Sequence, residues 1–248
     1  MIELVNYKLL ITYIGTAYTG WQVQPNSPTI QGVIEDLLFK IFKQRIVLLY
    51  SSRTDAGVHA LGQVANFVCE PKYDERAILL MLNTQLPEDI VVKSVEKVPR
   101  EFNSRHAKRK TYYYRIHNSK IKDPFKLNRV WWIPYKLNKS DMLEALELFK
   151  GKRDFNTFMS SGGGAKTTIR EIYDVRLVEK GDELWLYFTA NGFLKQMVRN
   201  IVGTVVDIGK GRYKASDVSK MLDSCDRTKA GVTAPARGLY LENVVYDE

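Results

Sequence analysis

The segment from residue 51 to residue 60 carries the side chains best suited to chemistry. It reads Ser-Ser-Arg-Thr-Asp-Ala-Gly-Val-His-Ala and places Arg53 two residues before Asp55. A carboxylate that a neighbouring guanidinium keeps ionised can act as a nucleophile or as a general base. An Asp in such a loop can equally be a turn residue that hydrogen-bonds its own backbone. The local sequence alone leaves both interpretations open.

Several other kinds of catalytic site do not fit the sequence. No second acid and no Ser/His pair accompany Asp55, so glycosidase and catalytic-triad chemistry are poor fits. The chain has two cysteines and three histidines without Cys-x-x-Cys or His-x-x-x-His spacing, which argues against a zinc site. The glycine-rich segment 160–168 lacks the Gly before its Lys that a P-loop requires. We therefore expect no metal, and we interpret this segment as a mobile loop.

The charge balance points to a polyanionic partner. Of 248 residues, 37 are Lys or Arg and 28 are Asp or Glu, so the net charge is +9, while 45% are hydrophobic and 26% charged. These fractions are typical of a folded soluble protein. The positive excess favours nucleic acid first and an anionic membrane surface second, although it could also serve solubility alone.

The sequence favours a cytoplasmic protein. No run of about 18 apolar residues is present, so no transmembrane helix is expected. The first residues alternate and include Glu3, which is typical of a strand rather than of a signal peptide. Two cysteines cannot build a disulfide framework and fit a reducing compartment.

The loop that holds Asp55 lies within a first half that reads strand, helix, strand, strand, helix, strand. Thr29 is a plausible N-cap for the first helix, because apolar residues recur at helical spacing from Ile30 to Phe42. Asp74 opens the second helix, which extends through Leu82. The expected strands are 7–14, 46–51, 63–68 and 90–98.

The second half repeats this order. We expect strands at 111–116, 170–179, 183–189 and 239–246, and helices at 140–149, 193–208 and 216–222, with Ser140 capping the first. Two successive β-α-β-β-α-β units predict an α+β protein of two ferredoxin-like halves with mostly antiparallel sheets. We place the first domain, with the Asp loop, at residues 1–104 and the second at residues 105–248.

Seven segments, in order and spanning nearly the whole chain, resemble the TruA family of tRNA pseudouridine synthases. Two of them are Arg-Thr-Asp-Ala-Gly-Val-His-Ala at 53–60 and Met-Val-Arg-Asn-Ile-Val-Gly at 197–203. The matching segments are 15–24, 31–35, 53–60, 82–90, 110–116, 193–203 and 234–241. The chain departs from the family pattern at Ile14, Ser52 and Asn103, none of which replaces a catalytic group.

The resemblance implies an isomerase that converts uridine to pseudouridine at nucleotides 38, 39 and 40 of the tRNA anticodon stem-loop. It implies no organic cofactor and no metal, a central RNA-binding cleft, and a homodimer in which one tRNA contacts both subunits. Asp55 falls on the family's catalytic Asp. Whether it attacks C6 of the uracil or C1′ of the ribose stays open.

The resemblance also assigns roles to other side chains. Arg199 matches the basic residue that pairs with the catalytic Asp, and Arg53 would contact RNA phosphate and hold the target nucleotide out of the stack. Tyr112 matches the tyrosine that stacks on the uracil, which would also be suited to take a proton from C5. Tyr113 remains an alternative, because the segment from residue 102 is one residue shorter than is usual in the family.

A basic run precedes the tyrosine strand and is a candidate contact with the tRNA backbone. Its members that we expect to bind substrate are Arg105, Lys108, Arg109 and Lys110. The alternative interpretation is a solvated linker between domains. Two rival functions remain at this stage: an RNA-binding protein without activity, and a metal-dependent nucleotide hydrolase that uses the glycine-rich segment.

Overall fold

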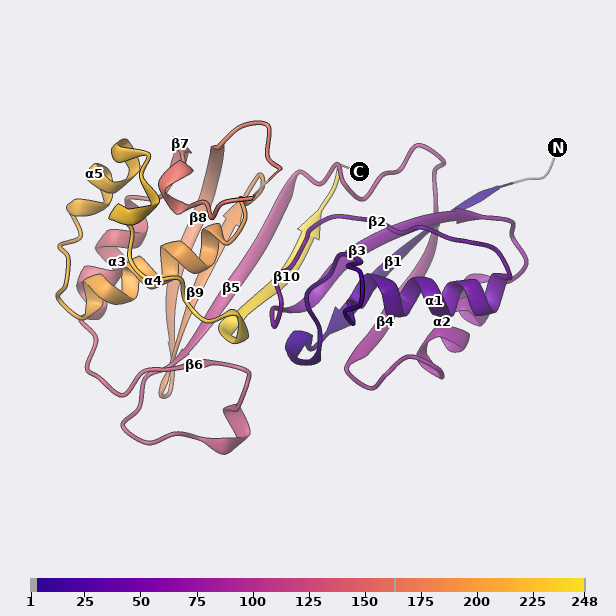
Figure 1. Cartoon of the computed structure of the whole chain (residues 1–248), viewed down its shortest axis with the longest axis horizontal. Coiled ribbons are helices and arrows are strands. Elements are labelled where there is room, and N and C mark those ends of the chain that lie inside the picture. The colour runs from indigo at the N-terminus through magenta and orange to yellow at the C-terminus, as the bar shows by residue number, and fades with distance from the viewer. Residues whose placement is uncertain (1–3, 163, 248) are drawn as a thin grey trace. The chain divides into compact units, whose positions relative to one another are not determined.

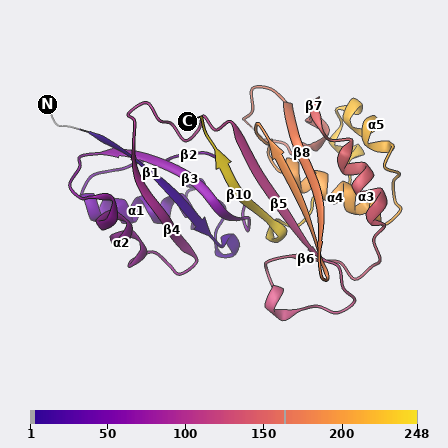
Figure 2. The same cartoon turned by 180° about the vertical axis from the view of Figure 1, so that it is seen from behind.

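A computed structural model describes residues 4–162 and 164–247. The chain divides into two compact units, one of Met1–Lys108 with Leu241–Glu248 and the other of Arg109–Tyr240. Figures 1 and 2 show the helices and strands of both units from opposite sides. Gly163, inside the predicted glycine-rich loop, lies outside the described residues.

The first unit is a mostly antiparallel sheet with helices on one face (Figures 1 and 2). Its strand order is β4-β1-β3-β10, and β2 pairs with β3. The elements in chain order are β1 (Val5–Tyr13), the 3-10 helix η1 (Gly15–Ala17), α1 (Ile30–Phe42), β2 (Leu49–Tyr50), β3 (His59–Cys69), α2 (Glu75–Asn83), β4 (Ile90–Val98) and the greater part of β10 (Leu239–Val245).

Local signals account for the helices of this unit. The Thr29 hydroxyl accepts a hydrogen bond from the Gly32 amide at 3.2 Å, and the Asp74 carboxylate accepts one from the Ala77 amide at 2.7 Å. Both predicted N-caps are therefore confirmed. Tyr7, Leu9 and Ile11 alternate along β1 and are fully buried, which gives the sheet its apolar face.

The second unit is also an antiparallel sheet, with strand order β5-β9-β8-β7, and the short β6 runs parallel to β5. Figures 1 and 2 show α3, α4 and α5 gathered on one face of it. The elements are β5 (Arg109–His117), η2 (Pro124–Lys126), β6 (Trp131–Trp132), α3 (Lys139–Glu147), β7 (Gly151–Asp154), η3 (Asn156–Phe158), β8 (Ile169–Lys180), β9 (Glu183–Ala190), α4 (Met197–Gly209), α5 (Asp217–Ser224), η4 (Arg227–Lys229) and η5 (Ala236–Gly238).

The N-terminal ends of α3 and α4 differ from the prediction for identifiable structural reasons. Asn138, and not Ser140, caps α3, because the Asn138 side chain accepts hydrogen bonds from the amides of Ser140 and Asp141. The helix expected from residue 193 begins at Met197, because Gln196 adopts a left-handed conformation with φ of 59°. The α+β class and the mostly antiparallel sheets are confirmed.

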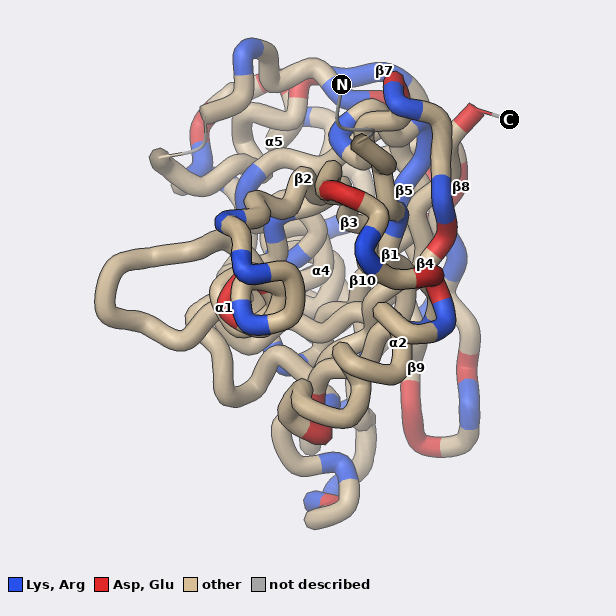
Figure 3. Tube along the Cα trace, turned by 90° about the vertical axis from the view of Figure 1, so that its right-hand side faces the viewer, with Lys and Arg blue, Asp and Glu red and all other residues tan. Residues whose placement is uncertain are grey.

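The Lys and Arg residues that give the chain its net positive charge are not confined to one segment. Figure 3 shows Lys and Arg positions in both units, with Asp and Glu positions between them. Within the described residues, the structure contains no helix with the length and apolar character needed to span a membrane.

Candidate active site

Asp55 lies in the loop that joins β2 to β3 in the first unit. The beginning of this loop is tied to β3 by three hydrogen bonds: the Ser51 amide donates to the Val64 carbonyl at 2.9 Å, the Ser51 hydroxyl donates to Gln63 Oε1 at 2.7 Å, and Gln63 Nε2 donates to the Ser52 carbonyl at 2.8 Å. Ser51, Ser52 and Gln63 are all buried. The approach to Asp55 is therefore fixed by the sheet.

The residues around Asp55 are held by backbone contacts. The Thr54 carbonyl accepts a hydrogen bond from the Trp21 amide at 3.1 Å, and the Asp55 carbonyl accepts one from the Val58 amide at 3.1 Å. Gly57, with φ of 78°, closes the turn. The Asp55 side chain itself is half-buried. Residues 55–58 therefore form a backbone turn that fixes the position of Asp55.

Two glycines let the segment from residue 15 to residue 21 lie directly against this loop. A Cβ on Gly15 would lie 2.0 Å from the Val58 carbonyl oxygen, and a Cβ on Gly20 would lie 2.5 Å from that of Thr54. Gly20 also has φ of 106°, which side chains rarely allow. The Gly15 amide donates to His59 Nδ1 at 3.0 Å. The sequence motifs matched both segments to one family but did not indicate that residues 15–21 pack against the Asp55 loop and support it.

Arg53 and the basic run differ in exposure. Arg53 is exposed, and its Nε donates to the Tyr50 hydroxyl at 3.4 Å. Arg105 and Lys108 are exposed in the first unit, where Lys108 forms an ion pair with Asp247. The run then crosses into the second unit. Its members there are Arg109 and Lys110, both on β5.

Arg109 and Lys110 have different surroundings. The Arg109 guanidinium lies 5.4 Å from the centre of the Tyr173 ring and is exposed. Lys110 is half-buried, and burial, together with the positive charge of Arg170, lowers its pKa to about 8. Lys110 is therefore not an ordinary surface lysine.

The three tyrosines of β5 point to alternate faces of the sheet. Tyr112 is buried and meets Phe193 edge-on, with ring centres 5.1 Å apart. Tyr113 points to the opposite face, where its ring stacks on Trp185 and on Tyr240 at 4.8 Å each. Those contacts occupy the Tyr113 ring. The two candidates left open by the sequence therefore lie on opposite faces of the sheet, each packed against other aromatic rings.

Arg199 is the third residue of α4 and is half-buried. Its Nε donates to the Ala234 carbonyl at 2.8 Å, and the Ala234 amide donates to the Arg199 carbonyl at 3.1 Å. Burial raises the pKa of Tyr114 well above its ordinary value, and the charge of Arg199 acts against that rise. The Tyr114 hydroxyl donates to the Pro235 carbonyl at 2.6 Å, so Arg199 and Tyr114 bind adjacent residues of one segment. Tyr114 lies two residues from Tyr112 on β5, on the same face of the sheet.

The segment that supports Arg199 is itself anchored on α4. A Cβ on Gly203 would lie 1.6 Å from the Val232 carbonyl oxygen, so only glycine admits this contact. Asn200 is fully buried, and its Oδ1 accepts hydrogen bonds from Arg227 Nη2 at 3.0 Å and from the Thr233 hydroxyl at 2.7 Å. Sequence reasoning gave no role to Arg227 or Thr233, because neither forms a local pattern.

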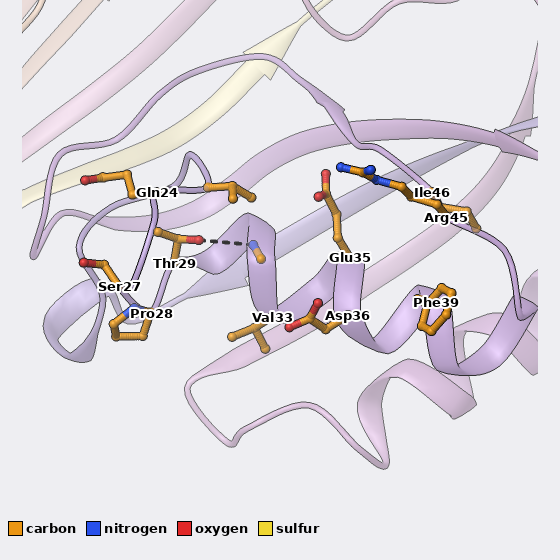
Figure 4. A pocket seen from close by; sticks show the side chains of 12 residues that line it. Gln24, Ser27, Pro28, Thr29, Val33, Glu35, Asp36, Phe39, Arg45 and Ile46 are labelled. Carbon is orange, nitrogen blue, oxygen red and sulfur yellow. Dashed lines mark hydrogen bonds between the residues drawn. The ribbon is translucent and has the colours of Figure 1, made fainter.

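The four predicted catalytic residues thus fall into two pairs, each within one unit. Arg53 and Asp55 share the loop of the first unit, and Tyr112 and Arg199 share the α4 side of the second. A pocket of about 470 Å³ along α1 contains none of them. Figure 4 shows its lining, with Glu35, Phe39 and Arg45 at one end and the Thr29 hydrogen bond at the other.

The chain belongs to the tRNA pseudouridine synthase family. The model of that family matches residues 9–124 and 145–247, which is most of the chain. It is therefore an isomerase that makes pseudouridine in tRNA. This assignment excludes the two rival functions, the inactive RNA binder and the nucleotide hydrolase, as the primary activity.

Within that class, the relatives identify the TruA family that the sequence motifs indicated. The chain is 47% identical to tRNA pseudouridine synthase A of Caldicellulosiruptor saccharolyticus over 242 residues, covering 97% of this chain and 99% of that protein. It is 43% identical to tRNA pseudouridine synthase A of Pseudothermotoga lettingae over 237 residues, covering 95% and 97%. Among solved structures, the chain matches an archaeal box H/ACA sRNP Nop10-Cbf5 complex with a TM-score of 0.36 and 10% identity. The match covers 81% of this chain and 44% of that one, and it is too distant to inform the site.

Proposed function

We propose that the enzyme isomerises uridine at nucleotides 38, 39 and 40 of the tRNA anticodon stem-loop, with Asp55 as the nucleophile. The observation that carries this proposal is the geometry of the Asp55 loop. Contacts from β3 and from residues 15–21 fix its backbone, while the Asp55 side chain stays half-buried. A nucleophile held in this way loses little conformational freedom when it attacks.

In the proposed reaction, the Asp55 carboxylate adds to C6 of the uracil or to C1′ of the ribose. The bond between N1 and C1′ breaks, the uracil rotates, and a new bond joins C5 to C1′. The C5 proton leaves to a base, N1 gains a proton, and the bond to Asp55 breaks to regenerate the carboxylate. No electron acceptor is consumed, because the product is an isomer of the substrate.

The other three predicted residues act on the carboxylate or on the nucleotide. We propose that Arg199 supplies the cation of the catalytic site, as the family resemblance implies. Tyr112 stacks on the target uracil, and a stacked base contributes about 1–3 kcal/mol. The exposure of Arg53 supports contact with an RNA phosphate beside the flipped nucleotide.

The exposed basic residues would bind the backbone of the same RNA. Arg105, Lys108 and Arg109 are all exposed, which supports phosphate contacts that carry no sequence information.

We also propose a cytoplasmic homodimer, on the strength of the family resemblance. Light scattering of the purified protein should then give twice the mass of the chain, and a monomer at working concentration would refute the dimer.

The site of modification can be tested by mapping. Unmodified tRNA transcripts that carry uridine at 38, 39 or 40 are incubated with the purified enzyme, and pseudouridine is located by mass spectrometry. We expect conversion at those three nucleotides and none at uridines outside the anticodon stem-loop. Conversion confined to another arm of the tRNA would overturn the proposed specificity while leaving the enzyme class intact.

A further inference from the structure

Two cationic side chains lie on one face of the second unit's sheet, beside Tyr112. On adjacent strands, Lys110 of β5 pairs with Ala190 of β9, and Ala190 pairs with Ile172 of β8. Arg170 precedes Ile172 by two residues, so its side chain emerges on the same face as that of Lys110. The small side chain of Ala190, between the two strands, leaves room above the sheet for both.

The position of the Arg170 guanidinium is fixed from two directions. Its Nη1 donates to the carbonyls of Thr167 at 2.9 Å and of Ile169 at 2.6 Å. A Cβ on Gly192 would lie 3.7 Å from Arg170 Nε, so the turn after β9 rests against the side chain. Within the described part of the unit, Nη1 makes all of the Arg170 hydrogen bonds, which leaves the Nε and Nη2 hydrogens to bind a ligand.

The electrostatics of this pair favour an anion. Burial, and then the charge of Arg170, lowers the pKa of Lys110 to about 8, and burial lowers the pKa of Arg170. Two cations that are partly withdrawn from water repel each other, and each loses hydration. An anion that accepts hydrogen bonds from both would offset these costs, and a planar guanidinium with an ammonium suits a phosphate.

The spacing along β5 connects this pair to the nucleotide. Lys110 and Tyr112 are alternate residues, so their side chains point the same way about 7 Å apart. A nucleotide whose base lies on the Tyr112 ring has its sugar between the base and a phosphate. A flanking phosphate is then within reach of the Lys110 ammonium.

We propose that Lys110 and Arg170 form a binding site for one phosphodiester phosphate of the RNA, adjacent to the target nucleotide. This inference rests on the proposed function and adds to it a defined phosphate and a residue, Arg170, that the sequence motifs did not indicate. It also gives Lys110 a place at the target nucleotide rather than on the outer RNA backbone.

The test pairs one protein cation with one phosphate. Short anticodon stem-loop RNAs carry cytidine at the target position, so that they bind without turnover. In each RNA a single phosphate near the target is replaced by an uncharged methylphosphonate. We expect one linkage to cost the wild-type enzyme about tenfold in affinity, and that cost to shrink severalfold in Arg170→Gln, where Lys110 alone still contacts the phosphate. With unmodified RNA, Arg170→Gln should also lower the slope of log affinity against log salt by about one.

Two further variants serve as controls. Arg176→Gln removes the same charge from the same strand, but Arg176 lies over the Tyr187 ring and pairs with Asp174 at 3.0 Å on the other face. It should retain the full cost of the neutral linkage. Lys110→Arg keeps a cation at its position and should retain that cost too. Thermal melting establishes that every variant is folded.

The proposal is overturned if no single linkage stands out in the wild-type enzyme. It is equally overturned if the sensitive linkage costs Arg170→Gln as much as it costs the wild-type enzyme. Failure of the proposed function looks different, because the wild-type enzyme would then form no pseudouridine at nucleotides 38–40, whatever the binding data show.

Discussion

The hydroxyl of Tyr13 lies 2.7 Å from Oγ1 of Thr54, the residue that immediately precedes Asp55. Tyr13 is the last residue of β1, and both side chains are buried. The contact therefore joins the core of the first unit to the loop that presents the proposed nucleophile. It provides a way to disturb the position of Asp55 without changing the carboxylate.

Tyr13→Phe should lower kcat for pseudouridine formation about tenfold, because the Thr54 side chain loses a partner that fixes the loop. Losing a buried hydrogen-bond partner should also cost about 1–3 kcal/mol of unfolding free energy. The control is Tyr7→Phe, which removes a hydrogen bond from the same strand to the Tyr73 carbonyl, away from the loop. Equal kcat values in the two variants, measured alongside urea unfolding, would show that the Tyr13 contact has no positioning role.

Gly20→Ala should destabilise the first unit and abolish most activity. The added Cβ would lie 2.5 Å from the Thr54 carbonyl oxygen, on a residue with φ of 106°. Gly181→Ala is a matched control, because Gly181 has φ of 62° but no atom within 4 Å of the added Cβ. Both variants carry backbone strain, so the additional loss of stability and activity in Gly20→Ala measures the steric clash with the Asp55 loop. Similar thermal melting and activity for the pair would contradict this account of the loop.

Tyr112→Phe and Tyr113→Phe separate the two tyrosines that the sequence left open. Phe at position 112 preserves an aromatic ring but removes the hydroxyl, so kcat should fall while KM changes little. Tyr113→Phe should remain close to wild type, because its ring packs between Trp185 and Tyr240 and phenylalanine can do the same. Steady-state kinetics on an anticodon stem-loop decide the question. The reverse pattern would assign the role to Tyr113.

Acid should destabilise the second unit through Glu183. Burial raises the pKa of Glu183, but hydrogen bonds from Arg115 and Lys126 outweigh burial and hold the pKa below its ordinary value. Arg115 Nε and Nη2 each lie 2.8 Å from a Glu183 oxygen. A lowered folded-state pKa gives stability that is fully present above the unfolded value of about 4.3 and is lost as pH falls through the folded value.

The measurement is the unfolding free energy as a function of pH. Glu183→Gln should be less stable than wild type at neutral pH, and the difference should shrink as the medium is acidified below about pH 4. Glu179→Gln provides the comparison, because Glu179 pairs with Lys139 at an exposed position and should change stability little. A difference between wild type and Glu183→Gln that stays constant with pH would disprove this linkage.

The sequence predicted those features of the fold that depend on neighbours in the chain. Thr29 and Asp74 cap α1 and α2 as expected, because an N-cap needs only its own side chain and the next turn. At α3 the sequence offered two nearby residues that could cap the helix, and the structure shows that the side chain of Asn138 accepts the hydrogen bonds, not that of Ser140. The strand β7 was missed, because its four residues are all exposed and it exists by pairing with β8.

The same limit applies to the candidate site. The motif at residues 53–60 could be recognised from the sequence, but the contacts of Gly15 and Gly20 with that loop join distant segments. Gln196, which adopts a left-handed conformation before α4, also contacts a distant segment. The Ser160 hydroxyl donates a hydrogen bond to its side chain at 2.6 Å. Arg170 carries no local signal at all. Its relation to Lys110 follows only from the register of three strands.

The most direct test of the account is Asp55→Asn, which keeps the size of the side chain and removes its charge and nucleophilicity. Purified wild-type and variant enzymes are incubated with unmodified tRNA, pseudouridine is mapped at nucleotides 38–40, and tRNA affinity is measured in parallel. We predict pseudouridine with the wild-type enzyme, none with Asp55→Asn, and comparable affinity for both. Pseudouridine formation by the purified, deamidation-free variant would contradict the assignment of Asp55 as the nucleophile.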